Sequence, residues 1–514
     1  DCVRSILDHT DGEDLEFVFI SKEFDEKTSR LIRQLLKKES TYRLIADVHN
    51  KGFVNLVNEG VRNSSKEFIL LLDPSTVVTE GWLSGMKDCF RRATDTGIVG
   101  PMTNHTSEAR QLIGSGDLKS RDQIEAFASS FRTRNLHRRF NVFRLSGFCM
   151  LFRKRFIHDI GLLDPSFDYC LMAWDTDLSM RCSLAGLKNT VAADVYVHGS
   201  LNSPPKSSAT LLAKWSALDP LTAKQLAALT AVERSWLMFE KGKLENAIDV
   251  LMDGVTSAPD NRGIYLCLAR ILIDSREYRE ALDALQSVAT WDKQHPETLE
   301  LSGYVLEALD RDLEADACAD VLLSARPGYG PALDVKGLLA YKRGELGQAE
   351  SLFRQAIQGD PGFAEPYRNL GLLKWTAGEK EEGLALMEKA FVLEPARKDN
   401  ALAYLSAAID RKACERAEAV LTEARTLYPD NRNIAVLLID LLQRQDKTRL
   451  AMDEIQKCLV RFGANEDIVS IGLEIRDTLG PMAIDRPDAQ QGTLSVCMIV
   501  KNEEKNLPEC LESV

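Results

Sequence analysis

Four residues in the first 200 positions follow or adjoin apolar runs, where their side chains could do chemistry. Asp73 comes directly after Phe68–Leu72, a run with the length of a buried strand. Asp175 and Asp177 open a predicted helix, and His198 follows a second apolar run. Carboxylate oxygens suit hard cations, an imidazole can join them for an ion such as Mn²⁺, and a carboxylate can accept a proton. These residue types indicate a metal site or acid–base chemistry.

Structural interpretations of the same residues stay open. Asp73 could cap a turn or helix, and His198 could be an ordinary histidine at a strand end. Between Glu125 and Asp159 the sequence has no acid, but it has eight basic residues: Arg132, Arg134, Arg138, Arg139, Arg144, Arg153, Lys154 and Arg155. We expect this stretch either to approach an anionic ligand or to form a solvated basic loop.

The elements that must position these residues alternate between strand and helix. Apolar runs and helical patterns predict a strand over 15–20, a helix over 26–38, a strand over 42–47, a helix over 54–63 and a strand over 67–72. This alternation favours an open, mainly parallel α/β sheet. In such sheets ligands bind at the carboxyl ends of the strands, which is where Asp73 falls.

A repeat of 34 residues follows this region. Small residues recur at that step: Ala247, Ala281, Ala315, Ala349, Gly383, Ala417 and Ala451. Prolines keep the same step at Pro259, Pro327, Pro361, Pro395 and Pro429. The spacing predicts about seven helix–turn–helix units over 228–465, and 466–479 is predicted to be a capping helix. The units resemble tetratricopeptide repeats, most clearly from Pro331 to Pro361.

Composition narrows the function classes. The chain has 514 residues, 45% of them hydrophobic and 27% charged, with a mean hydropathy of −0.19. No apolar run approaches the roughly 20 residues of a membrane span. Residues 1–200 are neutral overall, so the rest carries the net charge of −13, which argues against nucleic-acid binding. Eleven cysteines without a paired pattern predict free, buried thiols and a cytoplasmic protein.

Four ordered segments carry a resemblance to a known family. They are Asn50-Lys51-Gly52-Phe53, Asp73-Pro74-Ser75, Ser146-Gly147-Phe148 with Gly161 to Phe167, and Trp174-Asp175-Thr176-Asp177 ahead of His198. In this order and spacing, residues 1–200 resemble inverting family 2 glycosyltransferases of the GT-A fold. The resemblance implies a bacterial-type enzyme that moves a sugar from a nucleotide-diphospho-sugar to a glycan or protein hydroxyl.

The resemblance also implies roles for single residues. Asp175 corresponds to the base that deprotonates the acceptor, and Trp174 and Asp177 to acceptor-binding positions. A divalent cation, Mn²⁺ or Mg²⁺, would be held by Asp73 and His198. The donor would be contacted by five residues: Ser21, Asn50, Gly52, Asp73 and Ser75.

The sequence departs from the family pattern at three of these places. Ser21 stands where the family usually has an Asp that contacts the base of the nucleotide. Ser75 replaces the second acid of the metal motif, and Trp174 precedes Asp175 where a Glu is usual. Together these changes predict weakened metal and nucleotide binding. A catalytically degenerate domain that serves as a repeat scaffold for protein–protein interaction is therefore the alternative.

The two ends of the chain resemble one another. Residues 494–500 have the character of the family's first strand, which we expect to precede Asp1, and Glu509 to Val514 align with Asp1 to Ile6. The predicted organisation is a transferase domain over 1–200, a linker over 201–227, the repeats over 228–480, a linker over 481–493 and the start of a second transferase domain over 494–514. We expect this fragment itself to be weak or inactive, and strand 494–500 could complete the N-terminal sheet.

Three functions therefore compete. The first is a transferase whose repeat groove recruits the acceptor, a peptide or a partner protein. The second is an inactive scaffold, and the third is an adaptor in which the repeats alone matter. We predict the first, without assigning the sugar, the nucleotide or the acceptor.

Overall fold

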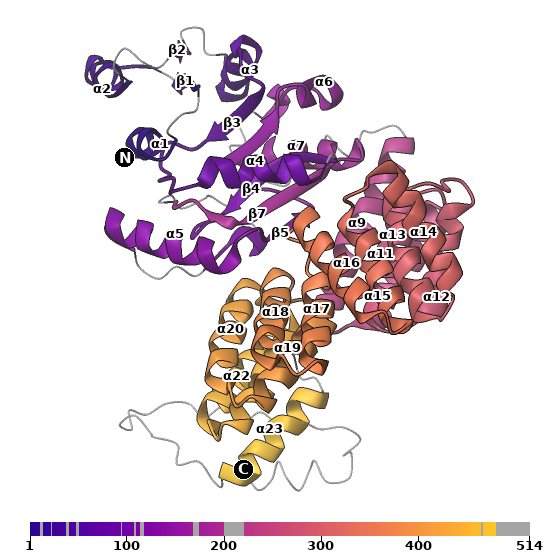
Figure 1. Cartoon of the computed structure of the whole chain (residues 1–514). Coiled ribbons are helices and arrows are strands. Elements are labelled where there is room, and N and C mark those ends of the chain that lie inside the picture. The colour runs from indigo at the N-terminus through magenta and orange to yellow at the C-terminus, as the bar shows by residue number, and fades with distance from the viewer. Residues whose placement is uncertain are drawn as a thin grey trace, which may run out of the picture.

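The structure is a computed structural model that describes residues 1–10, 14–21, 23–36, 41–47, 51–93, 95–106, 109–113, 118–167, 174–199, 220–463 and 466–479. Figure 1 shows a domain of strands and helices in contact with a curved stack of helices. The domain contains, in chain order, α1 (Cys2–Asp8), β1 (Glu16–Ser21), α2 (Glu26–Leu36), β2 (Thr41–Ala46), α3 (Phe53–Asn63), β3 (Phe68–Leu72), α4 (Trp82–Arg92), β4 (Thr96–Met102), η2 (Ala109–Gln111), α5 (Arg121–Asn135), β5 (Arg139–Val142), β6 (Cys149–Arg153), α6 (Phe156–Ile160), η3 (Pro165–Phe167), α7 (Trp174–Leu184) and β7 (Lys188–Tyr196).

The alternating pattern at the start of the chain is confirmed. The five elements predicted between residues 15 and 72 correspond to β1, α2, β2, α3 and β3, with ends that differ by two residues at most. These elements are short and strongly patterned, so the local sequence is enough to define them.

The strands form two sheets of different type. Strands β1 and β2 pair in parallel, and a separate sheet has the order β3-β6-β4-β7-β5. In that sheet β4 and β7 are parallel, whereas β6 is antiparallel to both β3 and β4, and β5 is antiparallel to β7. The prediction of a mainly parallel sheet was therefore wrong for this sheet. Strand β6 starts beside the end of β3 and therefore runs in the opposite direction: its first residue, Cys149, lies opposite Leu72, the last residue of β3.

Both faces of the larger sheet are covered, as the near-continuous apolar strands require. On β6, Cys149 and Leu151 pack against α4, which contributes Trp82 and Met86. Met150 and Phe152 of the same strand point to the other face, where α3, α6 and α7 contribute to the core. The alternation of these side chains, all at most 1% exposed, is the period of two expected for a strand.

The second part is a solenoid of paired helices. Its described helices are α9 (Pro220–Glu240), α10 (Leu244–Ser257), α11 (Arg262–Asp274), α12 (Tyr278–Ala289), α13 (Pro296–Ala308), α14 (Asp312–Ala325), α15 (Gly330–Lys342), α16 (Leu346–Gly359), α17 (Glu365–Thr376), α18 (Lys380–Leu393), α19 (Lys398–Asp410), α20 (Cys414–Leu427), α21 (Arg432–Arg444), α22 (Thr448–Phe462) and α23 (Glu466–Leu479).

The 34-residue period sets this packing. The alanines that define it lie on the second helix of each pair and are 0% exposed, because a small side chain lets that helix approach the first: Ala247, Ala281, Ala315, Ala349, Ala417 and Ala451. The first helices of successive pairs also contact each other, as α13 with α15 and α15 with α17. These helices therefore line the inner side of the curve.

No helix in the described ranges is both long and apolar enough to cross a bilayer. The described cysteines form no disulfide with one another, and most of them are buried. Burial raises the pKa of the Cys89 and Cys182 thiols to about 12, so these side chains are inert parts of the core.

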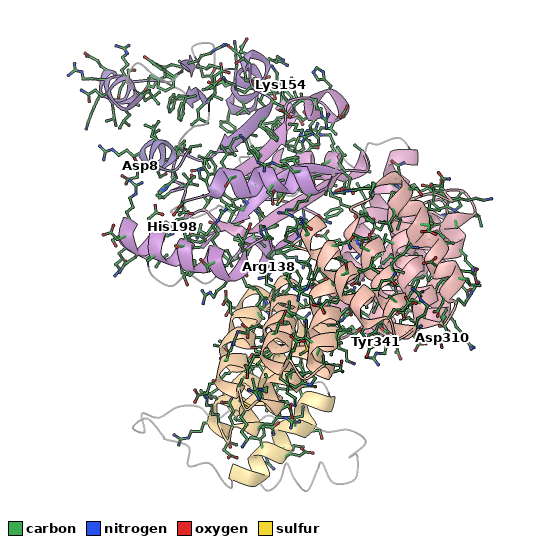
Figure 2. All side chains as sticks on the ribbon, in the orientation of Figure 1. Asp8, Arg138, Lys154, His198, Asp310 and Tyr341 are labelled. Carbon is green, nitrogen blue, oxygen red and sulfur yellow. The ribbon has the colours of Figure 1, made fainter. Side chains whose placement is uncertain are left out.

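The basic stretch between residues 125 and 159 was expected either to approach an anionic ligand or to form a solvated loop. Instead, several of its arginines contact other parts of the protein. Arg138 lies at the junction between the sheet and the solenoid (Figure 2), where its guanidinium stacks on Tyr428. Arg153 contacts Phe68 and Phe90 within its own domain. Among the described residues, ion pairs join the two parts of the molecule, and three of them come from this stretch: Arg134 with Glu423, Arg139 with Asp360 and Arg144 with Glu233. The others are Arg92 with Asp360, Arg110 with Glu240 and Lys188 with Glu297. The arginines at the junction bind the solenoid, so they form neither an anion site nor a solvated loop.

The two-pronged contact between Arg139 and Asp360 is one of the more enclosed of these ion pairs. Both guanidinium nitrogens of Arg139 donate to the carboxylate, one at 3.0 Å, and the two side chains are 19% and 21% exposed. We expect Arg139→Ala to lower the free energy of unfolding by about 1–2 kcal/mol, because it removes two charge-assisted hydrogen bonds. Urea unfolding followed by tryptophan fluorescence measures this.

Asp360→Ala and the double variant complete a double-mutant cycle. A coupling energy near zero would show that the pair does not hold the two parts together. Arg354→Ala is a matched control, because Arg354 makes its ion pairs on an exposed helix surface, with Glu350 and Glu382. It should cost less than about 1 kcal/mol.

Candidate functional site

Several chain segments meet at one edge of the larger sheet. Strands β3, β4 and β7 end there and β6 begins there, because β6 runs against β3 and β4. The Asp73 N–H donates to the Phe148 carbonyl at 2.8 Å, which joins the end of β3 to the start of β6. Val77 and His198 exchange backbone hydrogen bonds of 2.8 and 2.9 Å, which brings the end of β7 next to the turn after β3.

Asp73 shapes the turn that follows β3. Its Oδ1 accepts hydrogen bonds from the backbone N–H of Ser75 at 2.8 Å and from the Ser75 hydroxyl at 2.6 Å. The side chain is half-buried on the edge of the sheet. Asp73 is therefore a turn cap, one of the two interpretations left open by the sequence. The same carboxylate remains at the strand end, where the donor was predicted to bind.

Asp175 lies beneath the start of β6. Its side chain is 0% exposed, and its Oδ2 accepts a 2.8 Å hydrogen bond from the Gly147 N–H. A Cβ on Gly147 would stand 2.6 Å from the Trp174 ring, so only glycine allows helix α7 to approach this closely. The small-residue segment thus brings Trp174 and Asp175 to the edge where Asp73 lies.

Asp177 and His198 have different surroundings. The Asp177 carboxylate forms an ion pair of 2.9 Å with Arg181 one turn along α7, and Arg181 also donates to the Ile160 carbonyl at 2.6 Å. His198 Nδ1 is 2.9 Å from the Tyr196 hydroxyl, and burial lowers the pKa of His198. The imidazole is therefore neutral at pH 7, the form in which histidine can bind a metal.

The predicted donor-contacting residues lie on three segments. The Ser21 hydroxyl at the end of β1 donates to the Glu23 carbonyl at 2.7 Å. Gly52 begins α3 with φ of +87°, a conformation that favours glycine, and its N–H donates to Asp47 at 3.1 Å. Asn50 lies outside the described residues.

One cavity of about 1310 Å³ connects part of this set. Ser21, Asp73, Ser75 and Trp174 all line it. Among the described residues, Gly52, Asp175, Asp177 and His198 do not line it, although Asp175 follows Trp174 and His198 precedes the lining residue Gly199. The cavity thus unites the predicted donor side with one acceptor residue, and Asp175 and His198 lie next to its lining residues.

His105 is a lining residue that sequence reasoning missed. It follows the end of β4, which points to the same edge as the end of β3. The sequence did contain a signal for His105, because ligands are expected to bind at residues that shortly follow a parallel strand. It went unnoticed because β4 carries no strong apolar pattern.

The described residues could hold a metal ion here only together with the phosphates of a substrate. In the described part of the chain no three His, Cys, Asp or Glu side chains gather into a metal site. Mg²⁺ commonly takes one or two carboxylates and completes its shell with water and substrate phosphates. Asp73 fits the role of that single carboxylate, so the residues suit a cation that arrives with a diphosphate.

One family model and two curated relatives match the N-terminal part of the chain. Residues 1–217 match the model of the family described as "Glycosyltransferase like family 2". Poly-beta-1,6-N-acetyl-D-glucosamine synthase of Staphylococcus epidermidis is 23% identical over 163 residues, which are 32% of this chain and 35% of the relative. The same enzyme from strain RP62A gives the same figures. The chain thus matches about a third of the length of these curated relatives.

Solved structures resemble the solenoid. A thermophilic TPR protein of Thermus thermophilus is 19% identical and covers 35% of this chain and 99% of its own, with a TM-score of 0.31. A tetratricopeptide repeat protein of Parabacteroides merdae is 18% identical and covers 48% of this chain and 98% of its own, with a TM-score of 0.26. The architecture is an α/β domain that matches the family 2 transferase model, followed by an array of paired helices that repeats every 34 residues.

The inner side of the solenoid holds a second group of titratable residues. Asp334 on α15 is 0% exposed and accepts hydrogen bonds of 3.0 Å from the Tyr304 hydroxyl and the Asn369 amide. Burial raises the pKa of Asp334 to about 7. In the unfolded chain an Asp has a pKa of about 3.9, so the folded protein binds this proton more tightly.

This difference predicts that the solenoid loses stability as pH rises from about 4 to 7, because the ionised carboxylate is disfavoured only in the folded state. The slope from this group should be on the order of 1 kcal/mol per pH unit. Asp334→Asn should remove that slope while keeping an acceptor for Asn369. Urea midpoints measured between pH 5 and pH 8 test this, and an unchanged slope in the variant would contradict the assignment.

Proposed function

We propose that the N-terminal domain transfers a sugar, with inversion, from a nucleotide-diphospho-sugar to a hydroxyl of a glycan or protein. The supporting observation is the single cavity lined by Ser21, Asp73, Ser75 and Trp174 at the carboxyl edge of the sheet, with Asp175 directly behind Trp174. Transfer of the sugar develops negative charge on the departing nucleotide diphosphate. A bound Mg²⁺ or Mn²⁺ would neutralise part of that charge, and Asp73, with His198 for Mn²⁺, would hold the cation.

In this proposal the remaining residues act on the two substrates. Asp175 takes the proton from the acceptor hydroxyl as that oxygen attacks the sugar carbon. Trp174 offers a ring surface to the acceptor. Asp177 holds the first turn of α7 through its ion pair with Arg181 and so positions Trp174 for the acceptor. Ser21, Asn50, Gly52 and Ser75 contact the nucleotide side of the donor. Family 2 relatives here are named for poly-N-acetylglucosamine synthesis, so nucleotide-activated N-acetylglucosamine is the first donor to test.

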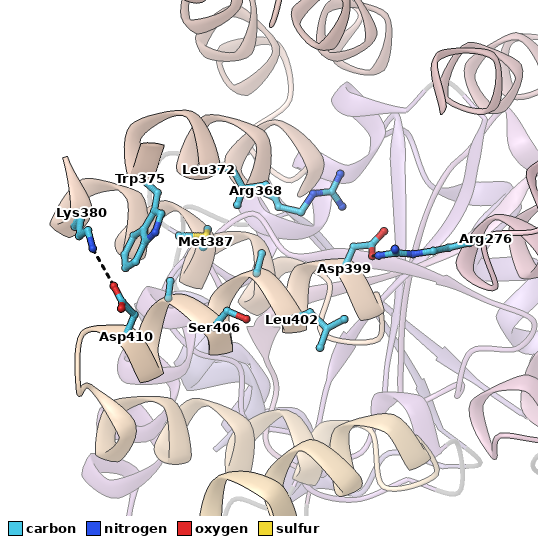
Figure 3. Close-up of a pocket in the computed structure, with 12 residues that line it drawn as sticks. Arg276, Arg368, Leu372, Trp375, Lys380, Met387, Asp399, Leu402, Ser406 and Asp410 are labelled. Atoms are coloured by element: carbon cyan, nitrogen blue, oxygen red, sulfur yellow. Dashed lines mark hydrogen bonds and ion pairs between the residues drawn. The ribbon is translucent and has the colours of Figure 1, made fainter. Parts of the chain in front are cut away.

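The solenoid would recruit the acceptor or a partner protein rather than form a wall of the site. It contacts the domain next to β5, at the opposite edge of the sheet from β3 (Figure 1), and residues of β3 line the cavity. A second cavity of about 700 Å³ lies on the inner side of the solenoid between α17 and α19. Trp375, Leu372 and Leu402 line it, and the last two are 43% and 38% exposed (Figure 3). An exposed apolar surface inside a concave groove suits the side chains of a peptide.

The test is calorimetry of a full-length version of the protein with UDP- and GDP-sugars, with and without Mn²⁺, joined to a turnover assay. Binding that needs the cation, together with sugar transfer, is the expected result. Absence of binding to every donor would support the scaffold instead.

The scaffold is the second candidate because two observations favour it. The Ser75 hydroxyl donates a hydrogen bond to Asp73. Ser75, which replaces the second acid usual in the family, is therefore part of the turn. Asp175 is 0% exposed, so it must gain access to an acceptor before it can act as a base. Donor binding without any turnover would fit this scaffold, with a retained donor site.

A further inference from the structure

Three consecutive residues ahead of β6, Ser146 to Phe148, connect the two sides of the candidate site. The Phe148 carbonyl accepts a hydrogen bond of 2.8 Å from the Asp73 N–H, on the side proposed for the donor. The neighbouring Gly147 N–H donates at 2.8 Å to Oδ2 of Asp175, the proposed base. The separation of the two carboxylates therefore depends on where this segment lies, and a residue that holds the segment sets that separation.

Gln111 holds this segment through its side-chain amide. The Ser146 N–H donates to Gln111 Oε1 at 2.7 Å, and Gln111 Nε2 donates to the Pro101 carbonyl of β4 at 3.0 Å. Strands β4 and β6 pair at Ile98 and Val99. Beyond that point along β4, the amide of Gln111 connects the two chain segments as a peptide group of a paired strand would, with one donor and one acceptor.

The fold fixes Gln111 at both its backbone and its side chain. Its carbonyl accepts from the Thr103 N–H at 2.9 Å, which attaches the short helix η2 to the chain just after β4. The side chain is 0% exposed and lies against Gly100, where a Cβ would stand 2.7 Å from Nε2. Glycine at that position leaves the room that the amide needs. A buried amide that is hydrogen-bonded through both its oxygen and its nitrogen is held rigidly.

We propose that Gln111 is a positioning residue for sugar transfer, which sets the place of the Asp175 carboxylate relative to the donor. Gln111 is buried and does not line the cavity, so it acts through Ser146 and Gly147 rather than on a substrate. A misplacement of about 1 Å of a reacting group can cost on the order of 10²-fold in rate, so such support matters. The effect on transfer rests on the proposed function, whereas the contact with Ser146 does not.

Gln111→Met removes both hydrogen bonds and keeps a side chain of similar length. In a full-length version of the protein, we expect kcat to fall roughly 10- to 100-fold and KM for the donor to change less than about threefold. The reason is that the turn between Asp73 and Ser75 keeps its own hydrogen bonds, whereas the segment that supports Asp175 loses its anchor. A wild-type kcat in this variant would overturn the proposal.

Gln111→Glu adds a dependence on pH that a loss of packing alone would not produce. The neutral acid can donate to the Pro101 carbonyl and accept from the Ser146 N–H, as the amide does. The ionised acid instead places an oxygen without hydrogen where Nε2 lies 3.0 Å from that carbonyl. Relative to the wild type at each pH, kcat should be nearly normal at about pH 6 and fall toward about pH 9. Circular dichroism checks that the variant stays folded, and a constant kcat ratio would contradict the proposal.

Asn58 provides a matched control within the same domain. It is 2% exposed, and its amide also holds a backbone segment: Nδ2 donates to the Leu163 carbonyl at 2.7 Å, and Oδ1 accepts from the Leu163 N–H at 3.0 Å. Asn58→Leu should lower the melting temperature as Gln111→Met does, because each leaves buried backbone groups unpaired. Its kcat should stay within about twofold of the wild type. An equal loss of kcat in both variants would reduce the effect of Gln111 to general destabilisation and overturn the proposal.

Hydrogen exchange tests the contact independently of sugar transfer. In Gln111→Met, the Ser146 and Gly147 amides should exchange at least about tenfold faster than in the wild type, whereas the Val191 amide of β7 should keep its rate. Unchanged exchange at Ser146 would overturn the role of Gln111 even in an active enzyme. Faster exchange in a protein whose wild type transfers no sugar would confirm the contact and overturn the proposed function instead, so the two failures are distinguishable.

Discussion

Replacement of Asp175 by Asn is expected to reduce sugar transfer by roughly 10²- to 10⁴-fold while donor affinity stays within about twofold. A positioned general base contributes about that factor to a rate, and an amide cannot take up the acceptor proton. The amide oxygen can still accept the hydrogen bond that Gly147 donates at 2.8 Å, so the contact between α7 and β6 is kept. A radiolabelled donor gives the transfer rate, and calorimetry gives the affinity.

Thr176→Val is the matched control for this variant. It removes the hydroxyl that donates to Asp175 Oδ1 at 3.2 Å but leaves the carboxylate in place. Its transfer rate should fall less than tenfold. If Asp175→Asn transferred sugar at the wild-type rate, Asp175 would not be the base.

Replacement of Asp73 by Asn has the second large expected effect, and it acts on binding. Asn can keep the hydrogen bonds that close the turn to Ser75, at 2.8 and 2.6 Å, but it lacks the charge that attracts a cation. We expect the affinity for donor in the presence of Mn²⁺ to fall at least tenfold, and the affinity without Mn²⁺ to change little. Calorimetric titrations with and without the ion give both values.

Ser75→Ala separates the turn from the charge. It removes the 2.6 Å hydrogen bond to Asp73 and leaves the carboxylate intact, so the dependence on Mn²⁺ should persist. An equal loss of affinity in Asp73→Asn with and without the ion would show that Asp73 serves the turn rather than a metal. Equal effects of Asp73→Asn and Ser75→Ala would lead to the same conclusion.

The junction between the two parts bears on how a recruited acceptor could reach the site. Arg139, Arg144 and Arg110 fix the solenoid to the domain through Asp360, Glu233 and Glu240, and Phe140 packs on Tyr428 with ring centres 6.2 Å apart. These ion pairs lie next to β5, whereas β3, which lines the cavity, is at the other edge of the same sheet. An acceptor held in the groove must therefore be long, or belong to a neighbouring copy, to place its hydroxyl near Asp175.

The sequence by itself determined the elements and the periodic part of the fold. The 34-residue recurrence of Ala247 and its equivalents predicts the solenoid, because each unit repeats the same local packing requirement. The first strands and helices were predicted nearly to the residue, and α23 was predicted over 466–479, where it is found. Position after a strand was enough to place Asp73 at the edge of the sheet, since the carboxyl end of a strand is set by local sequence.

Only the tertiary structure decided which side chains meet. Arg139 and Arg144 bind acids more than 80 residues further along the chain, and Asp177 pairs with Arg181 rather than facing the cavity. The antiparallel direction of β6 was likewise absent from any local pattern. A long charged side chain binds whichever surface the fold brings within its reach, and a strand's direction depends on its neighbours. Neither choice is encoded in the few residues around it.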